Sequence, residues 1–77
     1  MPHIIVKLWP GNTEAQKQEL TERIARDVME VTGCSERSVS VAIIEVAPQD
    51  WGEQVYRPDI AGAAEHITKQ PGYPPPE

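Results

Sequence analysis

The chain has few means of holding a small fold together by covalent bonds or metal ions. Of its 77 residues only Cys34 is a cysteine, so no disulfide can form within the chain. The two histidines, His3 and His66, have no third ligand at a regular spacing, and we expect no metal site. A domain of this size buries only about 60% of the surface that its unfolded chain exposes. We therefore expect a homo-oligomer to supply the missing core.

Basic residues and long apolar runs are also scarce. Seven Lys and Arg face twelve Asp and Glu, a net charge of −5, which excludes the clustered basic surface of a nucleic-acid-binding protein. No apolar run approaches the roughly 18 residues that a membrane span requires. The N-terminus lacks the basic segment and long apolar run of a secretory signal. We expect a cytoplasmic protein with neither a nucleic-acid nor a membrane partner.

The first half of the chain predicts strand, helix and strand. Residues 3–9 form a strand-like apolar run. From Thr13 apolar residues recur at helical spacing, which predicts a helix over 13–32. Thr13 with Gln16 fits a capping box, and Gly33 fits a left-handed stop. The apolar stripe of this helix consists of Leu20, Ile24, Val28 and Val31.

Residues 38–46 predict a second strand, rich in β-branched side chains. Strand, helix and strand at this spacing form a parallel, right-handed β-α-β unit of the α/β (α+β) class. The second half of this strand is apolar on both faces, which favours burial of one face by the helix and of the other by a partner. Because two strands are too few for independent stability, we expect a second subunit to complete the sheet.

The second half of the chain predicts a turn, a helix and a tail. Pro48 ends the strand, and residues 48–52 have turn chemistry. Pro58 suits the first turn of a C-terminal helix that ends near Gln70. Residues 71–77 are rich in proline and predict a frayed or draped tail. Residues 2–70 then form a single domain.

Pro2 is the principal candidate for chemistry. If Met1 is removed, Pro2 carries a free secondary amine at the head of a strand. Burial lowers the pKa of an α-amino group from its usual value of roughly 7.7–8.0, toward the pH at which a base works best. Met-Pro also begins many chains by chance, so the position alone does not establish this role. His3 could border the same site because it is adjacent to Pro2.

With its β-α-β pattern the chain resembles the tautomerase superfamily, typified by 4-oxalocrotonate tautomerase. The resemblance covers about residues 2–52: Pro2 matches the catalytic proline, Glu14-x-Gln16-Lys17 the helix start, and Trp51 an aromatic pocket residue. It implies a keto–enol tautomerase, an isomerase without metal or cofactor, in which Pro2 is general base and acid. Residues 56–73, especially Lys69 to Tyr73, resemble the longer phenylpyruvate tautomerase-like subgroup, which favours a dimer over a hexamer.

The expected substrate is a small enolisable 2-oxo acid such as an arylpyruvate. In the type enzyme two arginines bind substrate carboxylates, and their places hold Asn12 and Ser40 here. Both can donate hydrogen bonds, but neither offers the planar fork of arginine. Arg37 is a candidate substitute, although a structural ion pair explains it equally well.

Two tryptophans, Trp9 and Trp51, are either core residues or aromatic walls of the substrate site.

Two other functions remain open. The superfamily also contains hydratases or dehalogenases and a decarboxylase, which need a protonated Pro2 and an arginine anchor. The uncharged residues at 12 and 40 disfavour them. A non-enzymatic dimeric interaction module is the alternative if Met1 is retained, because the Pro2 nitrogen is then an amide without basicity.

Overall fold

The computed structural model describes residues 1–76, which form two compact units. The first spans Met1–Glu45, and the second begins at Val46. Glu77, the last residue of the predicted tail, lies outside the described residues. The division into a domain over 2–70 and a tail stays a prediction. In the described part of the chain, no helix combines the length and apolar character that crossing a membrane requires.

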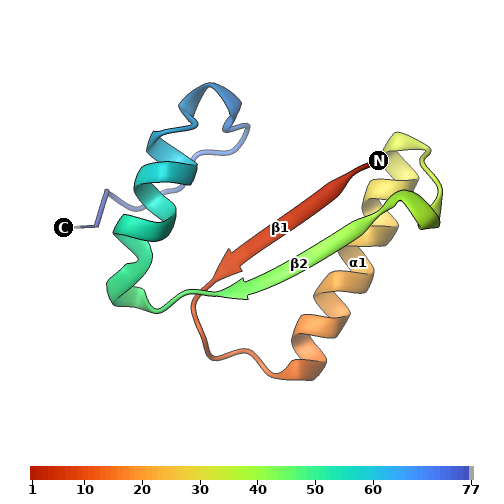
Figure 1. Cartoon of the computed structure of the whole chain (residues 1–77), viewed down its shortest axis with the longest axis horizontal. Coiled ribbons are helices and arrows are strands. Elements are labelled where there is room, and N and C mark those ends of the chain that lie inside the picture. The colour runs from red at the N-terminus through yellow and green to blue at the C-terminus, as the bar shows by residue number, and fades with distance from the viewer. Residues whose placement is uncertain (77) are drawn as a thin grey trace. The chain divides into compact units, whose positions relative to one another are not determined.

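The first unit is the predicted β-α-β unit. Strand β1 (His3–Leu8) leads into helix α1 (Glu14–Thr32), and the chain returns through the short 3-10 helix η1 (Glu36–Ser38) to strand β2 (Ser40–Glu45). The strands are parallel, with His3 opposite Ser40 and Leu8 opposite Glu45. Both strands therefore begin at one end of the unit and finish at the other (Figure 1). The fold class is confirmed, while the second strand is shorter than the predicted 38–46.

Helix α1 begins and ends as its sequence predicts. The Thr13 hydroxyl accepts a hydrogen bond from the Gln16 backbone, and the Gln16 side chain accepts one from the Thr13 backbone. These bonds satisfy two amide groups that would otherwise lack helical partners. Gly33 ends the helix at a φ of 76°, a conformation that glycine adopts without steric cost. The predicted stripe is wrong at its last member, because Val31 is 85% exposed.

The two faces of the sheet differ in burial. Val41, Ile43 and Glu45 alternate onto the face that α1 covers, where Lys17 of α1 forms an ion pair with Glu45. The other face, which we call the open face, is formed by His3, Ile5, Lys7, Ser40, Ala42 and Ile44.

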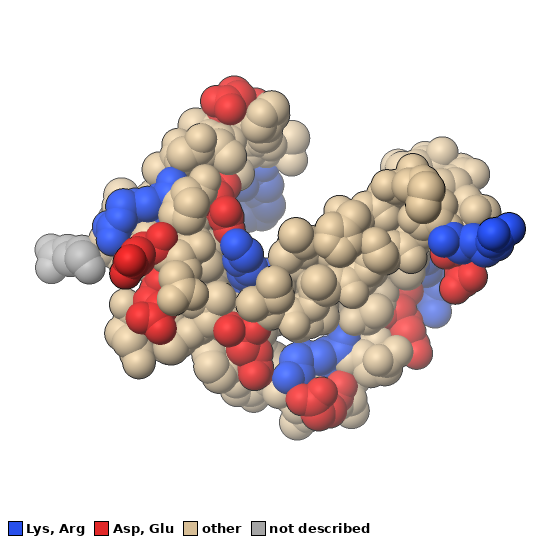
Figure 2. Space-filling model, in the orientation of Figure 1, with Lys and Arg blue, Asp and Glu red and all other residues tan. Residues whose placement is uncertain are grey.

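Two large apolar side chains of the open face are left in contact with water. Ile5 is 52% exposed and Ile44 42% exposed. Figure 2 shows a band of uncharged surface on the first unit, flanked by charged side chains. Among residues 1–45, all of which the structure describes, no side chain is fully shielded from solvent. A single copy of the β-α-β unit therefore has a weak core.

The second unit departs from its prediction. It contains the 3-10 helix η2 (Pro48–Asp50), the π-helix η3 (Gly52–Ala61) and the 3-10 helix η4 (Ala64–His66). The helix predicted to start at Pro58 and reach Gln70 is wrong, because η3 begins at Gly52 and holds Pro58 in its interior.

The wider turn of η3 explains the difference. A π-helix bonds each amide to the carbonyl five residues back, as Gly62 N–H does to Arg57 O at 2.7 Å. The predicted start assumed α-helical spacing, in which an interior proline is costly. Val46 and Val55 are the two buried apolar side chains among residues 1–76. Because Val55 belongs to η3, its burial stabilises the helix in the observed position.

Candidate active site

Pro2 lies at the head of β1 and is half-buried. Its carbonyl oxygen accepts a hydrogen bond from the backbone N–H of Ser40 at 3.2 Å. This bond continues the parallel ladder by one residue and joins Pro2 to the start of β2. Met1 precedes it and is fully exposed. The sheet thus holds Pro2 through its carbonyl group, and this bond does not involve the nitrogen of the predicted base.

Ser40 lies beside Pro2, as a substrate contact would require. Its hydroxyl oxygen is 2.7 Å from Nδ1 of His3, across the two strands. Both side chains are exposed on the open face. Sequence adjacency places His3 next to Pro2, but its pairing with Ser40 depends on the strand register, which the sequence does not specify.

Arg37 lies at the same end of the unit, in η1, three residues before Ser40. Its side chain is exposed. The loop between α1 and β2 therefore brings a cation to the part of the unit that holds Pro2. This placement fits the predicted substitute for a missing arginine.

Asn12 and Trp9 lie at the opposite end of the unit. They follow the last residue of β1, and the six residues of this strand separate them from Pro2. At about 3.3 Å per residue the separation is roughly 20 Å, too far for one small substrate to contact both ends. The structure brings Ser40 and Arg37 toward Pro2 within one chain, but not Asn12 or Trp9.

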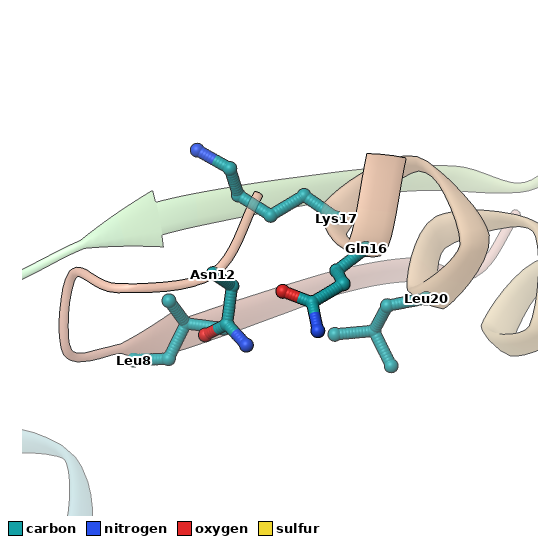
Figure 3. Close-up of a pocket in the computed structure, with 5 residues that line it drawn as sticks. All are labelled: Leu8, Asn12, Gln16, Lys17 and Leu20. Carbon is teal, nitrogen blue, oxygen red and sulfur yellow. The ribbon is translucent and has the colours of Figure 1, made fainter. Parts of the chain in front are cut away.

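Asn12 borders a small hollow between the end of β1 and the start of α1. The hollow has a volume of about 60 Å³ and is lined by Leu8, Asn12, Gln16, Lys17 and Leu20. Figure 3 shows the two amide side chains at the hollow and the Lys17 side chain directed away along β2. Sites for small molecules typically measure about 300 Å³ or more. This hollow is too small to be a complete substrate site.

The ammonium of Lys17 is already paired with carboxylates. Its Nζ lies 2.8 Å from Glu14 and 3.4 Å from Glu45. The hydrogen bond to Glu14, followed by the bond to Glu45, raises the pKa of Lys17 against the opposing effect of burial. The cation joins α1 to β2, so we assign Lys17 a structural role.

Trp51 belongs to the second unit and is held by the tail. Its indole N–H donates a hydrogen bond to the Tyr73 hydroxyl at 2.9 Å. The Tyr73 ring also packs against Tyr56, with ring centres 5.8 Å apart and an angle of 57°. The sequence predicts a tail that is either frayed or draped over the protein. These contacts of Tyr73 fit the draped form. Its bond occupies the only donor of the Trp51 side chain and leaves the indole faces for apolar contact.

Comparison with known proteins decides the family of this chain. Residues 2–58 match the family described as "Tautomerase enzyme". The chain belongs to the tautomerase family. It is similar to a "Probable tautomerase" of Xylella fastidiosa (strain 9a5c), with 51% identity over 95% of this chain and 89% of the relative. It is also 36% identical to "Tautomerase PptA" of Cronobacter sakazakii, over 95% of this chain and 97% of that protein.

A solved structure supports the same assignment. The crystal structure of TomN, described as a 4-oxalocrotonate tautomerase homologue in the tomaymycin biosynthetic pathway, has a TM-score of 0.63 and 28% identity. The match covers 65% of this chain and 77% of TomN. The resemblance to the 4-oxalocrotonate tautomerase family is thus confirmed, and the tautomerase described here is an isomerase.

Proposed function

We propose that this tautomerase interconverts the keto and enol forms of a small 2-oxo acid, such as an arylpyruvate, with the amine of Pro2 as its base. The observation that carries the proposal is the position of Pro2 at the head of β1, where it is half-buried and its carbonyl oxygen accepts a hydrogen bond from the Ser40 backbone N–H. Removal of Met1 is part of the proposal, since only a free Pro2 nitrogen can accept a proton.

The proposed reaction moves one proton within the substrate. The Pro2 nitrogen takes a proton from the carbon next to the carbonyl, and the electron pair of that C–H bond moves toward the carbonyl oxygen to form an enolate. The enolate oxygen then receives the proton from the Pro2 ammonium. Atoms and charge balance without a redox step, so the proposed mechanism needs no metal or cofactor. Stabilising the enolate oxygen contributes most to such a reaction.

We propose that substrate contacts come from both ends of the β-α-β unit, through two copies of the chain. Ser40 and Arg37 belong to the end that holds Pro2. Asn12 and Trp9 would come from a second copy, because β1 separates them from Pro2 of their own chain. Trp51 would present an indole face to an aryl substrate, with Tyr73 fixing the other edge of the ring.

We propose that the second copy covers the open face, in a dimer. Ile5 and Ile44 expose apolar surface there, and the first unit lacks a fully buried side chain. Burying such surface contributes about 25 cal/mol per Å². A partner would therefore strengthen the core and could complete the site.

Replacing Pro2 with alanine tests the proposed base. Pro2→Ala leaves a primary amine without the ring, and we expect ketonisation of phenylenolpyruvate to slow by about a hundredfold or more, the range for loss of a general base. Intact mass must show that Met1 is absent from both proteins, and circular dichroism that both are folded. Ser38→Ala is the control, because the Ser38 hydroxyl donates to the carbonyl of Ser35, within the loop between α1 and β2. Equal turnover by Pro2→Ala and the parent enzyme would refute the proposed base.

A further inference from the structure

The pair formed by His3 and Ser40 has no part in the proton transfer assigned to Pro2, yet it adjoins that residue. His3 is the next residue in the chain, and the Ser40 backbone bonds to the Pro2 carbonyl at 3.2 Å. The side chains of the pair are 2.7 Å apart, a short distance for a bond between nitrogen and oxygen. The register and the side-chain bond thus join His3 to Ser40, while the backbone bond and the sequence connect the pair to Pro2.

The proton on Nδ1 of His3 determines what Ser40 can donate. A serine hydroxyl has one hydrogen. If Nδ1 of a neutral His3 carries no proton, it accepts that hydrogen, and Ser40 has none left for a substrate. In a protonated imidazole both nitrogens carry hydrogen, so Nδ1 must donate to the Ser40 oxygen. The hydroxyl hydrogen of Ser40 is then free to point elsewhere.

We propose, on the basis of the function proposed above, that His3 in its protonated form positions the Ser40 hydroxyl as a donor to the carboxylate of the 2-oxo acid. The pair then supplies both features that an anion site needs, a positive charge and a hydrogen-bond donor. It takes a role for which this chain has no arginine at positions 12 and 40. His3 is a positioning residue, and Ser40 is the group that contacts substrate.

Other charged groups of the first unit also attract or repel the same anion. Lys7 lies on the open face of β1, and η1 carries Glu36 and Arg37. The Pro2 amine, when protonated, also attracts a carboxylate. The pH dependence of anion binding by the wild-type enzyme alone therefore does not separate the contribution of His3 from those of the other groups. Variants of His3 that keep the hydrogen bond but lack the charge are needed.

The first experiment measures inhibition by 3-phenylpropanoate, an arylpyruvate analogue without the keto group. His3→Asn retains a side-chain donor and acceptor for Ser40 but cannot become charged. Below pH 6, where histidine is largely protonated, we expect its inhibition constant to exceed the wild-type value about tenfold, as for loss of a bond to a charged group. At pH 8 the two constants should agree within about twofold. Ser40→Ala should weaken inhibition similarly at low pH.

The controls exploit two residues outside the proposed site. His66 is the only other histidine and sits in η4. His66→Asn and Ser38→Ala should match the wild-type constants at each pH. The neutral analogue 3-phenylpropanamide should bind His3→Asn and wild type alike, because it has no carboxylate.

The second experiment observes the ring directly by proton NMR, which needs no turnover. With two histidines in the chain, His66→Asn leaves His3 as the only imidazole signal. Saturating 3-phenylpropanoate should move the titration midpoint of this signal to higher pH, because the anion binds the protonated ring more tightly. The neutral amide should leave the midpoint unchanged.

Two results would overturn the inference. One is an inhibition constant of His3→Asn equal to wild type at every pH. The other is a His3 midpoint that the carboxylate does not move. Either result would leave the proposed base intact if Pro2→Ala remains inactive. Full activity of Pro2→Ala would instead refute the proposed function while the anion site could still be measured by binding.

Discussion

The two ends of the β-α-β unit carry different chemistry. At the start of the strands lie Pro2, the proposed base, and the hydrogen-bonded side chains of His3 and Ser40. At the finish, Asn12 and Trp9 offer an amide and an aromatic surface beside a hollow of about 60 Å³. In the proposed mechanism the first end moves a proton and the second only binds substrate. Because β1 separates them, a site that uses both must combine two chains.

Blocking the base should have the largest effect. One glycine inserted between Met1 and Pro2 leaves the fold of the sheet unchanged but turns the Pro2 nitrogen into an amide. Since an amide nitrogen has no basicity, we expect activity on phenylenolpyruvate to fall by about a hundredfold or more. The rate is measured by absorbance, with intact mass defining the first residue. If the insertion variant is as fast as the parent, the Pro2 amine is not the base, and the two ends do not differ in the way proposed.

Mixing two defective variants tests whether the ends cooperate across chains. Pro2→Ala and Asn12→Ala should each be impaired. Unfolded and refolded together, they should give active sites that combine an intact Pro2 with an intact Asn12. Random pairing of chains predicts about a quarter of the wild-type sites. Activity no higher than the mean of the two separate variants would place both residues in sites of a single chain or outside the site.

A charge on the open face should separate the copies. Ile44→Lys places an ammonium in the surface proposed to be buried by a partner, and desolvating it costs several kcal/mol. We expect a lower sedimentation coefficient and loss of activity. Val31→Lys is the matched control, because Val31 is 85% exposed at the end of α1, where a cation is favourable. Equal sedimentation of the two variants would mean that the partner does not cover Ile44.

The helix start should contribute less. Thr13→Ala removes the hydroxyl that accepts from Gln16 and should lower the free energy of unfolding by about 1 kcal/mol. Thr13→Ser should retain most of this stability because it keeps the hydroxyl. Urea unfolding measures both. Since α1 follows the Asn12 end of the unit, loss of Thr13 should affect inhibition by 3-phenylpropanoate less than loss of Ser40 does.

The smallest effect is expected from the ion pairs of Lys17. Its pKa is raised in the folded chain, chiefly by Glu14, so its contribution is present below pH 10.5 and is lost as pH rises through the folded value. Lys17→Met should therefore be slightly less stable than wild type near neutral pH, and the difference should disappear in alkali. Thermal unfolding from pH 7 to 11 measures this. Arg23→Met, which removes an exposed pair with Glu19, is the control.

Local sequence signals predict the first unit well and the second poorly. Thr13, Gln16 and Gly33 act within one helical turn, so the bounds of α1 follow from neighbouring residues. Pro58 misled the prediction because η3 has π-helical spacing, and burial of Val55 rather than proline placement determines where it lies.

The same distinction holds for the candidate site. Pro2 is recognisable from its place behind Met1, and Ser40 from its place in the family pattern. The bond between His3 and Ser40, and that between Trp51 and Tyr73, join residues 37 and 22 positions apart. Such contacts depend on register and on the path of the tail, which no periodicity reveals.

The most direct test is the titration of the Pro2 amine by nitrogen NMR in protein freed of Met1, compared with the pH profile of kcat/KM. We expect the amine to lose its proton below the usual 7.7–8.0 and at the same pH as the rising limb of the profile. An amine that titrates well above neutral pH, or apart from that limb, would contradict the role of Pro2 as the base.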